Sequence, residues 1–544
     1  MADTGFQNIY TNNEFADWQR GATVNQQYTY SFINNSAFYA SLPMYIRPFM
    51  QRQVQQWLWW YDGYVPFFHK EDNGIMSTRL ATALVNKISK KVFGSRLLLK
   101  NAGKQTDKVA PNKSLQGMVD WATKTNLERS LRKALTFTAA AGFSMVKTNK
   151  DIDGTLWVEP VRADRFVSMI DSSTGKIRAC DFYLLTTAQT KNAMEDSATV
   201  YFLLERRYYG DYKPIGKEVQ KNVPLVEYSV FRAVGSVINN NGVLSMNEKG
   251  RERIPFSQLP KPVRKAILES YGALMFDIPT PLPFTDLGCD LLTWTDGVSG
   301  LPELPYGESV LSTILPYLQE YDVINSSMIS DIYLGRGRVM VPAGLQNMNS
   351  VDGVANWDSG LDSMMYVKLP GVNGEDGKPE SIQFDLRAED WSKERDTILE
   401  NIAVNIGIST STVGAFLNDV SARTAREVSA EENETVAYVA DCRGRLETPI
   451  NKMLNRVRLY LGLEDKVEIR WTQANLSNPY MVTEMKASQV AQGLTSIEDA
   501  IAELNPDDDE EQIAQKVARA KADYKERGGA TLGFNDDESD VMLQ

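Results

Sequence analysis

One long helical tract constrains the fold of this chain more than any other part of the sequence. Residues 424–461 contain one proline and one interior glycine, and their apolar residues recur mostly every three or four positions. At about 1.5 Å per residue, the tract predicts a rod of roughly 55 to 60 Å, with Pro449 as the place for a kink. Few monomeric enzymes need such a rod.

Two further helices of similar length are predicted upstream of the rod. Residues 388–406 form a charged amphipathic helix, and an earlier helix runs to about residue 334, with Pro316 near its start. The earlier helix carries a continuous apolar stripe. The loop predicted between 388–406 and the rod begins with residues 407–414, which include two glycines and four hydroxyl residues.

A small β-module is predicted between these two helices. Three short strand candidates lie at residues 338–341, 364–369 and 381–386, and loops rich in Gly, Asn and Asp separate them. The module therefore has the position of an insertion that two matched helices flank.

The first half of the chain is predicted to mix helices and strands. Residues 1–45 are polar and irregular, which predicts an N-terminal arm, and aromatic residues crowd the helix that follows. Helices are then predicted at 78–92 and 115–148, and strands at 156–158, 165–170, 177–185, 200–209 and 225–234. Helices that precede an antiparallel sheet define an α+β fold class. Residues 278–305 are rich in proline and glycine and predict a domain boundary.

Composition excludes several classes of protein. The chain has 544 residues, which exceeds a single core and predicts about two to four modules. It contains no apolar run of about 18 residues and no signal-peptide pattern, so we expect no membrane partner. Cys180, Cys289 and Cys442 are too scattered for a disulfide framework or a zinc site, which fits a reducing compartment.

Charge and histidine content restrict the chemistry further. The chain has 58 basic and 70 acidic residues, and its net charge of −12 argues against tight electrostatic binding of nucleic acid. His69 is the only histidine, which excludes a multi-histidine metal site and leaves a Ser-His-Asp triad only if His69 serves in it. No catalytic residue, cofactor or metal is predicted.

Two sequence patterns imitate enzyme sites without completing them. The glycines Gly371 and Gly377 resemble a phosphate loop, but their spacing is one residue too long, and Pro379 stands where a hydroxyl would hold magnesium. Asp286 and Asp290 could in principle bind a metal ion, although carboxylates on a surface loop are the simpler interpretation. A metal-dependent nuclease remains a remote alternative.

Five short motifs, in a fixed order, together resemble the portal proteins of tailed phages, especially those of long-tailed phages. They cover about residues 300–465. The motifs are Leu304-Pro-Tyr-Gly-Glu-Ser-Val-Leu311, Tyr321-Asp322, Asp331-Ile-Tyr-Leu-Gly-Arg-Gly-Arg-Val-Met-Val-Pro342, Asn405-Ile-Gly-Ile-Ser409 and Thr424-Ala-Arg-Glu-Val428.

The resemblance implies a portal-type fold and a division of labour along the chain. It assigns residues 46–305 to a wing, 306–335 and 388–407 to two stem helices, 336–387 to a β-containing clip inserted between them, 408–422 to a tunnel loop, 423–482 to a long helix and a return to the wing, and 483–528 to a crown. Residues 1–45 and 529–544 have no counterpart in the family, and the latter are predicted to be a disordered tail.

The resemblance also implies partners and a location. It implies a homo-oligomer of twelve subunits at a capsid vertex of the virion, assembled in the host cytoplasm, with weakly held double-stranded DNA in its channel. The terminase large subunit, the major capsid protein and head-tail adaptor or neck proteins are the expected partners. A capsid or tail structural protein other than a portal is the main alternative, since it would share the composition.

Two sets of functional residues follow from these assignments. Residues expected to face the channel from the tunnel loop are Thr412, Val413, Gly414, Ala415, Phe416, Leu417, Asn418 and Asp419. Residues expected to bury the apolar stripe of the first stem helix against neighbouring subunits are Ile314, Tyr321, Ile324 and Met328.

Overall fold

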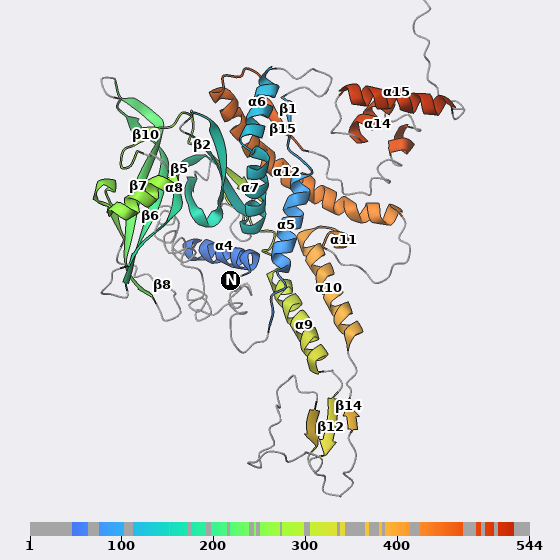
Figure 1. Cartoon of the computed structure of the whole chain (residues 1–544). Coiled ribbons are helices and arrows are strands. Elements are labelled where there is room, and N and C mark those ends of the chain that lie inside the picture. Colours follow the sequence, from blue (N-terminus) through green and yellow to red (C-terminus); the bar gives the residue numbers. More distant parts are fainter. Residues whose placement is uncertain are drawn as a thin grey trace, which may run out of the picture.

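The structure is a computed structural model, and its elements are labelled in Figure 1. It describes residues 46–63, 75–102, 113–151, 153–170, 176–191, 197–214, 218–238, 244–245, 251–271, 275–298, 305–334, 338–342, 365–368, 380–382, 387–413, 425–471, 486–490, 496–504 and 510–526. The arm at 1–45, His69, the phosphate-loop imitation at 371–378 and the tail at 529–544 lie outside these residues.

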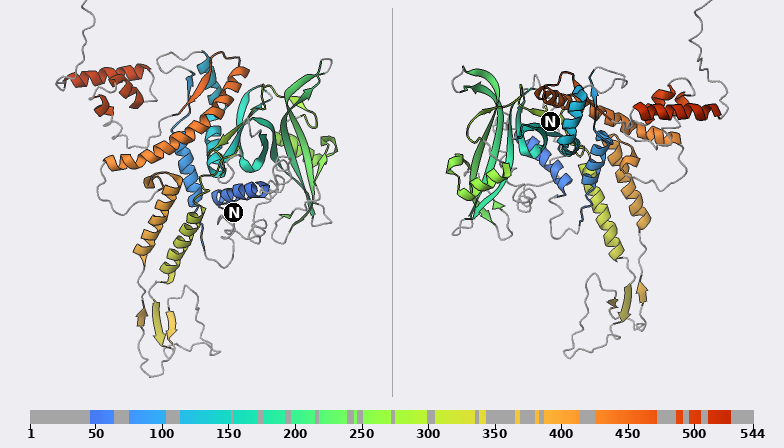
Figure 2. Two further views of the ribbon diagram at one scale, coloured as in Figure 1. Left: turned by 180° about the vertical axis from the view of Figure 1, so that it is seen from behind. Right: turned by 45° about the horizontal axis from the view of Figure 1, so that its top comes forward.

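The described part of the chain forms a body from which a pair of helices projects (Figure 1). The large sheet lies at one side of the body, and the C-terminal helices α14 (Ile497–Leu504) and α15 (Glu510–Glu526) lie at the other. Helices α9 (Leu315–Leu334) and α10 (Ala388–Ile406) descend side by side from the body, and both views in Figure 2 keep this arrangement.

The body contains two larger antiparallel sheets. The seven-stranded sheet has the order β10-β7-β6-β5-β4, with β8 and β9 paired to β7. Its strands are β4 (Phe166–Ile170), β5 (Ile177–Lys191), β6 (Ser197–Tyr212), β7 (Gln220–Ile238), β8 (Leu244–Ser245), β9 (Arg251–Ile254) and β10 (Thr280–Pro281). The three-stranded sheet has the order β11-β2-β3 and consists of β2 (Phe143–Lys150), β3 (Leu156–Arg162) and β11 (Cys289–Thr293).

Among the described residues, helices pack against these sheets around a large and a smaller hydrophobic cluster. The helices of the first half are α4 (Ile46–Asp62), α5 (Leu80–Phe93), α6 (Lys113–Lys124), α7 (Leu127–Ala141) and α8 (Lys261–Tyr271). One cluster includes fully buried Trp57 of α4, Leu131 of α7 and Leu446 of α12 (Ala425–Tyr460). A smaller cluster lies around Val263 and Ile267 of α8 and includes residues of the seven-stranded sheet. Because the larger cluster spans both halves of the chain, the long helix is part of the body's own core.

The predicted helix pair, β-module and rod are all present. Three strands at the far end of the pair form a sheet in which β12 (Arg338–Pro342) pairs with β13 (Met365–Lys368) in parallel and with β14 (Glu380–Ile382) antiparallel. After α10 come the short helix α11 (Thr410–Val413) and then α12, with Pro449 inside it. The strand β15 (Val467–Arg470) returns to pair with β1 (Leu98–Asn101). The predicted α+β class is therefore confirmed.

One prediction about the first half is wrong. The helix expected over 115–148 is α6 and α7, and it ends at Ala141 because Gly142 adopts a left-handed φ of 84°. Strand β2 follows, and its first six residues are all buried, so burial on both faces leaves no alternation of apolar and polar residues to mark it as a strand. Residues 278–305, where a boundary is expected, include strand β11, which pairs with β2, and the place of the boundary itself stays a prediction.

No helix among the residues that the structure describes is long and apolar enough to cross a membrane.

Candidate functional site

The segment before α9 anchors the helix pair to the body. The hydroxyl of Ser309 donates to the carbonyl oxygens of Ala140 at 2.7 Å and Ala139 at 3.1 Å, and the Val310 N–H donates to Ala139 O at 3.1 Å. The last carbonyls of α7 have no partner within their own helix. The first of the five motifs therefore caps α7 and fixes where the pair begins.

Two glycines let the backbones meet at this anchor. A Cβ on Gly142 would lie 2.4 Å from the carbonyl oxygen of Gly307, and a Cβ on Gly307 would lie 2.7 Å from that of Gly142. The Gly142 oxygen accepts a hydrogen bond from the Trp294 N–H at 2.8 Å, and the Glu308 N–H donates to the Thr295 hydroxyl at 2.6 Å. Only glycine permits this approach of backbone to backbone.

Asp322 on α9 ties the pair to the segment before α5. Its Oδ1 accepts hydrogen bonds from the Thr78 N–H at 2.9 Å and the Thr78 hydroxyl at 2.5 Å. The Ser326 hydroxyl one turn later accepts from the Met76 N–H at 2.8 Å. Burial raises the pKa of Asp322, and the two hydrogen bonds from Thr78 only partly oppose this.

Asp331 joins the far ends of the two helices, next to the β-module. Its Oδ2 accepts from the Arg387 guanidinium at 2.7 Å and from the indole N–H of Trp391 at 2.8 Å. The guanidinium also lies over the Trp391 ring, 5.1 Å from its centre. The bonds from Trp391 and Arg387 lower the pKa of Asp331, so the carboxylate stays charged where the chain enters and leaves the β-module.

A cluster of hydroxyl groups holds the upper end of α10 against α12. Gly407 ends α10 in a left-handed conformation, with its N–H donating to Ala403 O at 2.9 Å. The Thr435 hydroxyl of α12 accepts from the Ser409 N–H at 2.9 Å, and Ser409 Oγ lies 2.8 Å from Thr412 Oγ1. The Lys91 ammonium of α5 donates to Thr412 Oγ1 at 2.9 Å. The residues at the start of the predicted tunnel loop are therefore held against α12 and α5.

The base of the loop corrects part of the predicted channel surface. Thr412 is 2% exposed and Val413 is 8% exposed, so both side chains point into the subunit rather than toward a channel. The other channel-facing candidates, Gly414 to Asp419, lie outside the described residues.

The predicted stem contacts separate into two kinds. Ile314 is fully buried in the core of its own subunit, so its burial needs no neighbour. Tyr321, Ile324 and Met328 are half-buried, and the first two pack against the same core. Contacts of these three residues with a neighbouring subunit stay a prediction.

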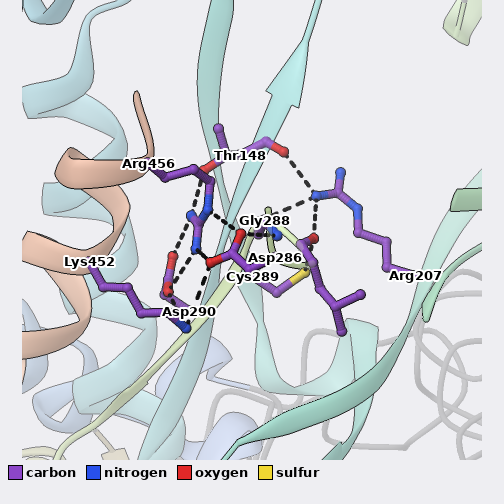
Figure 3. Close-up of polar contacts among 9 residues, drawn as sticks. Thr148, Arg207, Asp286, Gly288, Cys289, Asp290, Lys452 and Arg456 are labelled. Carbon is purple, nitrogen blue, oxygen red and sulfur yellow. Dashed lines mark hydrogen bonds and ion pairs between the residues drawn. The ribbon is translucent and has the colours of Figure 1, made fainter. Parts of the chain in front are cut away.

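A buried arginine of α12 binds the two acids that the sequence singled out (Figure 3). Arg456 donates to Asp286 at 2.6 and 2.7 Å and to Asp290 at 2.6 and 3.1 Å, and it also donates to the Thr148 hydroxyl at 3.1 Å. The side chains of Arg456 and Asp290 are 4% and 1% exposed. The expectation of carboxylates on a surface loop is therefore wrong for Asp290, because α12 packs over β11 and covers it.

Electrostatics keep this cluster charged. Burial acts to raise the pKa of Asp286, but the hydrogen bonds and charge of Arg456 outweigh it and hold that pKa below its ordinary value. Burial acts to lower the pKa of Arg456, but the charges and hydrogen bonds of Asp290 and Asp286 outweigh burial and raise that pKa above its ordinary value. The Lys452 ammonium lies 3.3 Å from Asp290 at the exposed edge. Two cations already satisfy these acids, which fits an ion-pair network better than a metal site.

A second buried arginine extends the network into the seven-stranded sheet. Arg207 of β6 donates to Glu205 at 2.7 Å and to the carbonyl oxygens of Thr148 and Leu287 at 2.9 and 3.1 Å. Burial acts to raise the pKa of Glu205, but the charges of Lys147 and Arg207 outweigh it and hold that pKa at about 2. The two arginines together join α12, both larger sheets and the loop before β11.

The burial of Arg456 was not among the expectations from the sequence, although the sequence contains a signal for it. Arg456 lies between Met453 and Val457 on the apolar face of the predicted rod, where a charged residue needs a buried partner.

Within the described part of the chain, no group of three or more His, Cys, Asp or Glu side chains could hold a metal ion.

Comparison with known proteins identifies the class to which this architecture belongs. The family model described as "Phage portal protein, SPP1 Gp6-like" matches residues 68–527, which is most of the chain. The chain therefore belongs to the phage portal protein family. No curated protein matches the chain. The family is one of structural proteins, and membership implies an oligomeric ring at a capsid vertex of the virion, with capsid and terminase partners.

Proposed function

We propose that twelve copies of this chain form a ring whose axial channel admits DNA during packaging and releases it during ejection. The observation that carries this proposal is the family match, which extends over the body, the helix pair and α12. The twelve-fold symmetry, the channel and the passage of DNA are parts of the proposal.

The helix pair and its β-module are the proposed stem and clip of this ring. Asp331 ties α9 to α10 next to the β-module, and Ser309 ties the pair to α7. A motor or neck protein bound at the β-module would thus contact a helix pair that polar contacts hold in place at both ends. We assign docking of the terminase large subunit and of neck proteins to this module, and docking of the major capsid protein to the body.

The segment between α11 and α12 is the proposed tunnel loop. The hydroxyl cluster of Ser409, Thr412 and Thr435 supports this role, because it fixes the base from which the loop extends. Gly414 and Ala415 are small, and Phe416, Leu417 and Asn418 offer van der Waals contacts and single hydrogen bonds without positive charge. A loop of this composition would contact DNA without binding it tightly.

The net charge of the subunit supports a channel through which DNA passes rather than a site that binds DNA tightly. Each tight contact to a phosphate adds an energy well that a packaging motor must overcome. A subunit with a net charge of −12 forms a strongly negative ring, which disfavours long-lived contacts with DNA. A capsid or tail protein of another kind would share the charge, but the family match favours the portal over it.

The loop assignment is tested by reversing one charge. Asp419→Lys should leave ring formation intact and add about one phosphate contact per subunit, which slows or halts packaging. The matched control is Asp419→Asn, which removes the negative charge without adding a positive one and should package at nearly the normal rate. Both rates are measured as the length of DNA protected from nuclease over time. Normal packaging by the lysine variant, or its failure to assemble, contradicts the assignment.

A further inference from the structure

Helices α5 and α7 lie side by side and expose cationic side chains. The hydroxyl oxygens of Ser89 in α5 and Thr136 in α7 lie 3.2 Å apart. Further along α5, the centre of the Phe93 ring lies 4.2 Å from the guanidinium of Arg132, which comes earlier in α7, so the two helices run antiparallel. The exposed cations form the α5–α7 patch: Lys87, Lys90, Arg129 and Lys133. Within the described part of the chain, none of these four forms an ion pair.

The N-terminal end of α12 has the opposite charge. Residues 425–434, the acidic end of α12, contain four acidic residues and one basic residue, and Glu434 is exposed. Figure 1 shows this end reaching past α5 and away from the body. Val436, Ala437 and Ala440, which follow it, are also exposed. Because alanine is small, this face of α12 lets another helix approach closely.

Helices α5 and α12 lie on opposite sides of the body. α5 lies in front of α12 in Figure 1, and α12 lies in front of α5 in the view from behind in Figure 2. In a closed ring, one face of each subunit meets a different face of the next subunit. A cationic patch and an acidic helix end on opposite sides of one subunit therefore complement each other all around such a ring.

We propose that the acidic end of α12 in one subunit docks on the α5–α7 patch of the next subunit. The proposal rests on the ring of the proposed function and names a contact that closes it. The carboxylates of the acidic end pair with the cations of the patch, and exposed Val436 packs beside them. The contact is heterologous, so it generates a ring rather than a two-fold dimer.

DNA is the other polyanion that a cationic patch can bind, and the surroundings of the patch favour a protein partner. Half-buried Phe137 of α7 lies within the patch, with its ring centre 5.5 Å from the Lys133 ammonium. Phosphates need only cations, whereas a helix that carries both carboxylates and an exposed valine matches cations that surround an aromatic ring. A second copy of the chain supplies that helix.

The test reverses the charge on each side of the contact separately, in the full-length protein. Lys90→Glu with Lys133→Glu makes the patch acidic, and Glu431→Lys with Glu434→Lys makes the helix end basic. Each double variant alone should lower the fraction of ring by more than about tenfold, because like charges would meet at every contact. Light scattering after size exclusion measures this fraction. The control Lys265→Glu, at a side chain of α8 that is 77% exposed, should leave it unchanged.

Mixing the two double variants is the decisive step. In an alternating ring, each unaltered acidic end meets an unaltered patch, and each basic end meets an acidic patch, so an equal mixture should recover the wild-type fraction of ring. Native mass spectrometry should find equal numbers of the two variants in each particle. A single chain with all four substitutions should also form rings by itself, since its two reversed faces attract each other.

Wild-type protein provides a measurement that needs no variant. Raising the salt concentration from about 0.1 M to about 1 M should release subunits from the ring, because salt screens the paired charges. Rings that are insensitive to salt would overturn the proposal even if a variant fails to fold.

The remaining outcomes separate this contact from the proposed function. Wild-type rings that persist in both double variants, or variants that neither mixing nor combination rescues, overturn the contact and leave the portal assignment in place. Unchanged rings with slower packaging in the patch variant assign the patch to DNA instead. Wild-type protein that forms no ring contradicts the proposed function, and the contact fails with it.

Discussion

At the scale of single residues, Arg456 joins several elements of the body. It connects α12 to both acids near β11 and to Thr148 of β2. A buried ion pair adds little to stability compared with apolar packing, but removing one partner leaves an uncompensated charge in the interior. The effect of a substitution therefore depends on which partner is removed.

Replacing Arg456 by methionine should strongly destabilise the subunit. Asp290, with a side chain 1% exposed, would keep only the exposed Lys452 as a cationic partner. We expect a loss of about 3 to 5 kcal/mol in the free energy of unfolding, measured by urea denaturation.

Lys452→Met is the matched control for this substitution. Lys452 contacts the same two carboxylates, but its side chain is 57% exposed, so its loss should cost less than about 1 kcal/mol. Equal losses in the two variants would show that Arg456 is not the residue that holds the network together.

The sequence identified Asp286 and Asp290 as a pair but could not assign their partner. Asp290 and Arg456 are 166 positions apart, and no local pattern connects them. Their meeting depends on the packing of α12 over β11, which is a tertiary contact. The same reason explains why Thr412 was placed on the channel, since its partners Thr435 and Lys91 are far from it in the chain.

At the scale of elements, the spacing of apolar residues predicted those helices and strands whose positions depend on local sequence. The bounds of α10 and α12 agree with the predicted helices within one residue at each end, and all three strands beyond α9 were expected. Strand β2 was missed because its burial on both faces removes the alternation that marks a strand. Strand β11 was missed because prolines and glycines surround it.

At Gly142, where α7 meets the segment before α9, the addition of one methyl group should destabilise the subunit. Gly142→Ala combines a left-handed φ of 84° with a Cβ placed 2.4 Å from the Gly307 carbonyl oxygen. We expect it to cost about 3 kcal/mol or more of unfolding free energy. Gly407→Ala has nearly the same φ, 82°, with nothing within 4 Å of its Cβ, and should cost about 1 to 2 kcal/mol. If the two variants are equally stable, the close approach at Gly307 is not a constraint.

The half-buried stripe of α9 tests contact between subunits. Substituting both Ile324 and Met328 with Asp would place unpaired charge in the proposed interface and should reduce the fraction of ring by more than about tenfold. Light scattering after size exclusion measures that fraction. Ser330→Asp, an exposed polar position on the same helix, should leave it unchanged. Rings of unchanged stability in the double variant would show that the stripe is misassigned.

At the scale of the whole molecule, a single subunit leaves several apolar side chains exposed to solvent. Val404 of α10 is 75% exposed, and Val323 of α9 and Val436 of α12 are also exposed. Val323 lies on the stem helix that is expected to contact neighbouring subunits, and Val404 lies on the second stem helix. An assembled ring would cover such surface, and an isolated subunit would leave it in contact with water.

The most direct test of the portal assignment is single-particle electron microscopy of the purified full-length protein, combined with the mass of the assembled particle. We predict closed rings with an open axial channel, a mass of twelve subunits, and the α9–α10 pairs arranged around the axis with their β-modules at one end. Monomers alone, or particles without a central channel, would contradict the account.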